Sequence, residues 1–161
     1  MTNRKRCAMN MSMNILKKYL KQENIIPSLK GETREEIYAE LLTLLAQRKE
    51  INDINFVLGV ILKRDKLIDS YMGKGVVIVR LHFDVQKRIS LVVGIKKEGI
   101  EEEVFDREKI NIFIIIINPE SGNEEYVNLV SSISILLNQG SIREDILEAK
   151  DNKAIAKILL E

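Results

Sequence analysis

The feature that most limits the fold of this chain is one uninterrupted run of six apolar residues, Ile112 to Ile117 (Ile-Phe-Ile-Ile-Ile-Ile). Five of the six are β-branched isoleucines, which favour extended backbone. The run is far shorter than the roughly 20 residues that span a bilayer, so it does not indicate a membrane helix. A strand without a polar face is usually covered on both sides. The run therefore predicts a sheet with a layer packed on each face.

Two further segments have the same β-branched character, Gly75 to Leu81 and Ile89 to Ile95, and a shorter extended stretch is expected over residues 25–29. Helical spacing of apolar residues predicts helices over residues 13–22, 33–49, 52–67, 124–137, 141–149 and 151–160. Strands flanked by helices in this order predict an α/β fold. We expect a single mixed β-sheet of about four to five strands with helices packed on both faces.

Two of these helices have more detailed signals. Thr33 to Glu36 form a capping box, in which the Thr33 hydroxyl and the Glu36 carboxylate accept from free backbone N–H groups, so a helix is expected to start there. The next helix should begin at Asn52 or Asp53. Its expected inward-facing residues are Phe56, Val57, Val60, Ile61 and Leu67.

Composition excludes several classes of function. The 161 residues carry 25 Lys or Arg and 24 Asp or Glu, a formal net charge of +1, which lacks the basic excess of a general nucleic-acid binder. One cysteine and one histidine cannot build a zinc cluster or an internal disulfide. We therefore expect no metal and no cofactor, and any imidazole chemistry must use His82.

The chain reads as one domain, residues 13–161, after a flexible tail over residues 1–12. The tail contains Arg4, Lys5 and Arg6, but no apolar stretch follows them as in a signal peptide. Without a signal peptide or a membrane span, a cytoplasmic location is expected.

The segment from Arg64 to Arg80 resembles the signature segment of a known family. It combines an arginine at a predicted helix end with the glycine turn and strand Gly73-Lys74-Gly75-Val76-Val77-Ile78. This pattern, and the order of elements from about residue 13 to residue 161, is similar to the enzyme IIA domain of bacterial phosphotransferase systems, of the fructose, mannitol and nitrogen-regulatory type. The resemblance implies an enzyme IIA fold and a protein partner, either the histidine phosphocarrier or a regulated target.

The chain departs from the family at the residues that carry its chemistry. Where the resemblance places a Pro-His pair with the phosphorylated histidine, this chain has Val79 and Arg80, and a second active-site histidine corresponds to Tyr126. Arginine is permanently protonated and has no lone pair, so Arg80 cannot accept a phosphoryl group. His82 lies two residues later on the same strand face, displaced by about 6.5–7 Å.

Three functions stay open from the sequence. The chain is a regulatory module that binds protein without phosphotransfer, a phosphocarrier in which His82 is a displaced acceptor, or an anion or metabolite sensor in which Arg64 and Arg80 clamp the ligand. The sequence leaves the sugar, the identity of the partner and the oligomeric state undetermined. The expected anion- or partner-binding residues are Arg64, Ser70, Gly73, Lys74, Gly75 and Tyr126.

Overall fold

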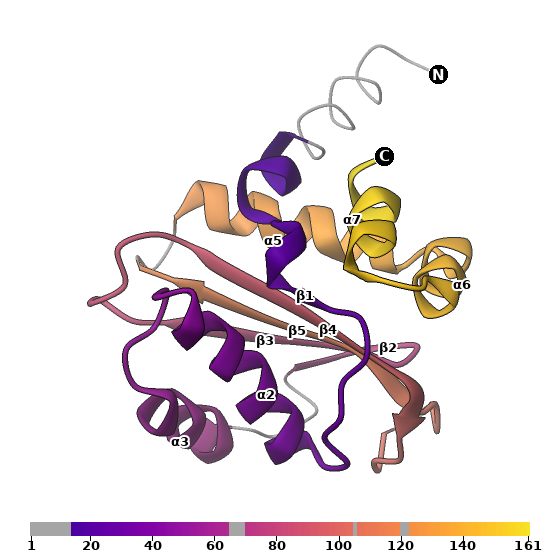
Figure 1. The fold of residues 1–161 in the computed structure, drawn as a ribbon, viewed down its shortest axis with the longest axis horizontal. Helices are drawn as coiled ribbons and strands as arrows, with labels where there is room; N and C mark the ends of the chain where they lie inside the picture. The colour runs from indigo at the N-terminus through magenta and orange to yellow at the C-terminus, as the bar shows by residue number, and fades with distance from the viewer. Residues whose placement is uncertain (1–13, 65–69, 105, 120–122) are drawn as a thin grey trace.

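The computed structural model describes residues 14–64, 70–104, 106–119 and 123–161, and in it five strands form one mixed sheet (Figure 1). The strands are β1 (Ile25–Ile26), β2 (Tyr71–Gly73), β3 (Val76–His82), β4 (Ser90–Ile100) and β5 (Ile110–Asn118), in the spatial order β1-β4-β5-β3-β2. β5 lies in the centre, parallel to β3 and antiparallel to β4. This arrangement confirms the predicted fold class. The predicted tail, residues 1–12, lies outside the described residues.

Helices cover both faces of the sheet (Figure 1). They are a helical segment at residues 14–19, the 3₁₀ turn η1 (Gln22–Asn24), α2 (Arg34–Gln47), α3 (Ile54–Arg64), α5 (Glu124–Leu137), α6 (Gly140–Glu148) and α7 (Asn152–Leu160). α2 and α3 pack on one face, whereas α5, α6, α7 and the 14–19 segment pack on the other. In the described part of the chain, no helix is long and apolar enough to cross a membrane.

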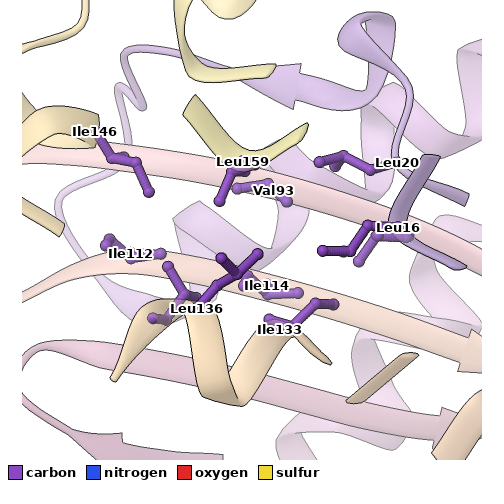
Figure 2. A pocket seen from close by; sticks show the side chains of 11 residues that line it. Leu16, Leu20, Val93, Ile112, Ile114, Ile133, Leu136, Ile146 and Leu159 are labelled. Atoms are coloured by element: carbon purple, nitrogen blue, oxygen red, sulfur yellow. The ribbon is translucent and has the colours of Figure 1, made fainter. Parts of the chain in front are cut away.

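The central strand β5 divides its side chains between the two layers, as its sequence predicts. Ile112, Ile114 and Ile116 pack against the α5–α7 layer, and Phe113 and Ile115 pack against the α2–α3 layer. All five are at most 2% exposed. A cavity of about 10 Å³ remains between the sheet and the α5–α7 layer, where apolar side chains from both converge (Figure 2). It is barely the size of one water probe and is entirely apolar, so it is a packing defect rather than a binding site.

The helix starts follow the sequence closely. The Thr33 hydroxyl accepts from the Glu36 N–H at 3.2 Å, as the capping box predicts. The Glu36 carboxylate, however, accepts from the N–H of Glu32 at 2.6 Å, one residue earlier than expected. Asn123 caps α5 through the N–H groups of Glu125 and Tyr126.

The predicted core face of α3 is only partly correct. Val57 and Ile61 are buried, but Phe56 is 58% exposed and Leu67 lies outside the described residues. Successive residues of a helix are about 100° apart, so Phe56 turns away from the side that buries Val57. Its ring instead contacts Phe83, with 5.8 Å between ring centroids.

The hairpin between β2 and β3 is a sharp turn through three consecutive residues with positive φ, Gly73 (91°), Lys74 (57°) and Gly75 (81°). The strand β2 was not predicted, because three residues give no periodic signal. At Gly75 a Cβ would lie 2.5 Å from the Lys109 carbonyl oxygen and 2.7 Å from Asn111 Oδ1, so both φ and space require glycine there.

A hydrogen-bonded network holds this turn. The Asp106 carboxylate accepts from the Lys74 N–H and from the Tyr71 hydroxyl, both at 2.8 Å, and the Tyr71 oxygen accepts from the Gly75 N–H at 2.9 Å. Burial raises the pKa of Tyr71 to about 12. Partial burial of Asp106 opposes its charge, but the donors from Lys74 and Tyr71 outweigh it and hold the pKa of Asp106 below its ordinary value.

Gly75→Ala should lower the free energy of unfolding by about 2–4 kcal/mol, because the new Cβ combines positive-φ strain with overlap against backbone. The matched control is Gly59→Ala in α3, where nothing lies within 4 Å of the added Cβ. That control should gain about 0.5–1 kcal/mol. Urea unfolding of both variants measures the difference, and equal effects would refute the role of Gly75.

Asp106→Asn should remove a pH-dependent part of the stability. A carboxylate whose folded pKa is depressed stabilises the fold above its unfolded pKa of about 3.9, and this stabilisation is lost as the pH falls through the folded value. Between pH 6 and pH 3, the variant should therefore lose less stability than the wild type in urea unfolding. Glu103→Gln, an exposed carboxylate in the same loop, is the control and should behave as the wild type.

Candidate functional site

The candidate site lies along the second half of β3. Val76 and Ile78 point into the α5–α7 layer, so Arg80 and His82, two and four positions after Ile78, belong to the same face. Arg80 is exposed and His82 is half-buried. Pairing with β5 sets their positions, since Arg80 lies opposite Ile116 and His82 opposite Asn118.

Tyr126, in the first turn of α5, lies near Arg80. The helix starts just after the loop that follows β5, and its Asn123 cap fixes that first turn beside the sheet. Burial raises the pKa of the Tyr126 phenol, and the positive charge of Arg80 opposes the rise. The two side chains therefore interact electrostatically, and the structure brings Arg80 and Tyr126 together, the two positions that the family resemblance pairs.

His82 has a partner of its own in the loop that follows β3. Its Nε2 lies 2.9 Å from Oδ1 of Asp84. A carboxylate can only accept, so Nε2 carries the proton in this contact, and a neutral ring keeps its lone pair on Nδ1. The contact orients the ring, because Asp84 follows His82 by only two residues.

Arg64 lies on a helix of the other layer. Arg64 is exposed at the C-terminal end of α3, a helix that packs on the opposite face of the sheet from Arg80 and His82. At a helix C-terminus its charge complements the helix dipole. Ser70 is a half-buried helical residue immediately before β2, and the residues between it and Arg64 lie outside the described part of the chain.

The glycine turn is also separate from Arg80. Gly73, Lys74 and Gly75 precede β3, and five residues at about 3.3 Å each place Gly75 about 16 Å from Arg80. The N–H groups of Lys74 and Gly75 already donate to Asp106 and Tyr71. The turn thus satisfies both amides within the fold, one with a carboxylate and one with a tyrosine hydroxyl.

Other residues at the start of α5 were missed by the sequence analysis. Lys18 of the 14–19 segment pairs with Glu125, and its hydrogen bond holds the pKa of Glu125 below the ordinary value. This pair ties the first helical segment to the helix that carries Tyr126. Its residues are more than 100 positions apart, so no local pattern signals it.

The described residues contain no group of three or more His, Cys, Asp or Glu side chains placed to hold a metal ion. The side chains described at the end of β3 are the guanidinium of Arg80, the half-buried imidazole of His82 and the half-buried phenol of Tyr126.

Comparison with known proteins identifies what the arrangement resembles. The profile of the family "Phosphoenolpyruvate-dependent sugar phosphotransferase system, EIIA 2" matches residues 18–161. The fructose-specific EIIABC component of Bacillus subtilis is 24% identical over 87% of this chain, which spans only 22% of that protein. The fructose-specific EIIA component of Haloferax volcanii is 24% identical over 80% of this chain and 84% of its own length.

Solved structures show the same fold. The nitrogen regulatory protein IIA-Ntr from Neisseria meningitidis superposes with a TM-score of 0.80 at 20% identity, over 90% of this chain and 99% of that one. The mannitol enzyme IIA of Escherichia coli, in its complex with phosphorylated enzyme IIB, gives 0.68 at 19% identity, over 87% and 96%. With the profile match across residues 18–161, these comparisons show that the chain belongs to the EIIA type 2 family of the phosphoenolpyruvate-dependent sugar phosphotransferase system.

Proposed function

We propose that this chain is a IIA-type domain of the nitrogen-regulatory kind that binds a protein partner and does not carry a phosphoryl group. The observation that carries the proposal is Arg80, which occupies the strand position that the family resemblance gives to the phosphorylated histidine. Phosphotransfer needs an uncharged nitrogen with a lone pair, and a guanidinium does not offer one at any physiological pH.

The surroundings of Arg80 support a binding role. Arg80 is exposed on β3, beside Tyr126. A guanidinium and a tyrosine ring are side chains that protein interfaces favour. A permanent positive charge stands where a phosphorylated family member would gain negative charge, so the preferred partner surface is acidic.

The competing function is phosphotransfer through His82. His82 is half-exposed and shares the face of Arg80, which favours this alternative. Against it, one strand repeat of about 6.5–7 Å separates the two positions, and phosphotransfer geometry tolerates about 1 Å. The Nε2 of His82 is also engaged by Asp84.

The class of partner is inferred from a related protein. The Escherichia coli mannitol enzyme IIA was solved in a complex with phosphorylated enzyme IIB. By analogy we propose that this chain docks an acidic surface of a phosphotransferase protein or of a regulated target around Arg80 and Tyr126.

Phosphotransfer can be tested directly. Incubation with radiolabelled phosphoenolpyruvate, enzyme I and the histidine phosphocarrier should leave the wild type unlabelled, with an active IIA domain labelled in parallel. Acid-labile label that disappears in His82→Gln would overturn the proposal and establish His82 as the acceptor. A double variant, Arg80→His with His82→Gln, tests the geometry, since label on it can only sit at position 80.

Binding gives an independent test. Arg80→Glu should weaken the affinity for the histidine phosphocarrier at least tenfold, because it reverses a charge at the centre of the proposed surface. Lys63→Glu, on α3 over the opposite sheet face, is the matched control and should retain wild-type affinity. Titration calorimetry measures both, and equal affinities would remove Arg80 from the interface.

A further inference from the structure

A second surface lies at the same end of the sheet but on the other side of β3. A groove of about 290 Å³ runs between the α2–α3 connection and the β3–β4 loop. These two connections lie close together (Figure 1), and the Gln86 side chain in the loop donates to the Glu50 carbonyl at 2.8 Å. This hydrogen bond joins the two connections that form the walls of the groove.

The groove contains apolar side chains that the core leaves outside. Phe56 is 58% exposed and Val85 is 88% exposed, and the Phe56 ring lies against that of Phe83. Apolar side chains stabilise a fold by being buried, so these exposed side chains contribute little to the stability of this one. Adjacent exposed apolar side chains are typical of interaction sites.

The rim of the groove is cationic. Lys49, Lys87 and Arg88 line it and are exposed, and the ion pairs recorded in the described part of the chain use other cations. Two carboxylates also line the groove, fewer than its three cations, and both accept hydrogen bonds from within the fold. Glu50 accepts from the Asn24 amide at 2.9 Å, and Asp53 accepts from the Phe56 N–H at 3.0 Å as a helix cap.

We infer that this groove docks an acidic segment of a partner protein, whose apolar side chain packs on Phe56, Phe83 and Val85 while flanking carboxylates pair with Lys87 and Arg88. The volume of about 290 Å³ is large enough for one or two side chains of such a segment. The basic residues Arg4, Lys5 and Arg6 make this chain's own N-terminal segment a poor occupant, since its charge has the wrong sign.

The inference deepens the proposed function, because it adds a second contact surface beside the one around Arg80. Phe83 directly follows His82, so the two surfaces flank the end of β3 on opposite faces of the sheet. A partner that covers this end of the strand contacts both. The groove binds both apolar and acidic side chains of the partner, whereas the surface around Arg80 binds acidic side chains alone.

The test is selection of a phage-displayed library of random 12-residue peptides against the full chain. Enriched peptides should contain Leu, Phe or Met flanked by Asp or Glu. Labelled with fluorescein, they should lose at least tenfold in affinity by fluorescence polarisation with Val85→Asp and with the pair Lys87→Glu, Arg88→Glu. Raised salt should weaken the wild-type complex as well, because the pairs are exposed.

Matched controls keep the groove separate from general charge and hydrophobicity. Leu62→Ser removes an exposed apolar side chain of α3 outside the groove, and Lys63→Glu reverses a charge there. Both should leave peptide affinity unchanged. Circular dichroism on each variant confirms that the fold is retained, which is expected because the substituted side chains are exposed.

Three outcomes would overturn the inference. The first is a selection that enriches no acidic peptide. The second is an enriched peptide that binds the groove variants normally and is lost only with Arg80→Glu, which leaves the proposed function standing without the groove. The third is concentration-dependent self-association of the wild type in light scattering that Val85→Asp abolishes, which assigns the groove to a second copy of this chain.

Discussion

The parallel pairing of β3 with β5 is the interaction on which the site depends. Seven consecutive residues of β3, Val76 to His82, are held in register against β5, which is itself buried between two helical layers. A slip of one residue would turn Arg80 into the α2–α3 core and expose its apolar neighbours. Because both faces of the sheet are covered, that slip is strongly disfavoured. The chemistry at the end of β3 is thus fixed by the packing of residues that take no part in it.

The sequence predicted the elements whose signal is local. The apolar runs of β3, β4 and β5 and the cap at Thr33 depend on neighbours a few residues away, and the structure contains them. β2 was not predicted, because a strand of three residues is too short to show a periodic pattern of apolar residues. The exposure of Phe56 was missed because the sequence Phe56-Val57-Leu58 does not show which of these adjacent apolar residues the sheet will cover.

The candidate site was predictable only in part, for a geometric reason. Alternation along a strand places Arg80 and His82 on one face, so their shared face follows from the sequence. The position of Tyr126 beside Arg80 was implied only by the family resemblance. The distance between the glycine turn and Arg80 also follows from the rise of a strand. The hydrogen-bond partner of the turn, Asp106, lies 32 residues from Lys74, and no sequence pattern indicates that contact. Arg64 belongs to a layer whose side of the sheet only the assembled fold decides.

Hydrogen bonds to Asp106 tie the β2–β3 hairpin to the connection before β5. One carboxylate accepts from Lys74, from Tyr71 and from the Glu108 N–H, so two chain segments are joined at their tips as well as through their strands. Loop tips ordinarily open at low free-energy cost and independently of the core. Here the tip of the β2–β3 hairpin cannot open without releasing the connection beside it. We therefore expect the two to open as one cooperative unit, with the amide of Lys74 exchanging with solvent on the timescale of the sheet rather than of a surface turn.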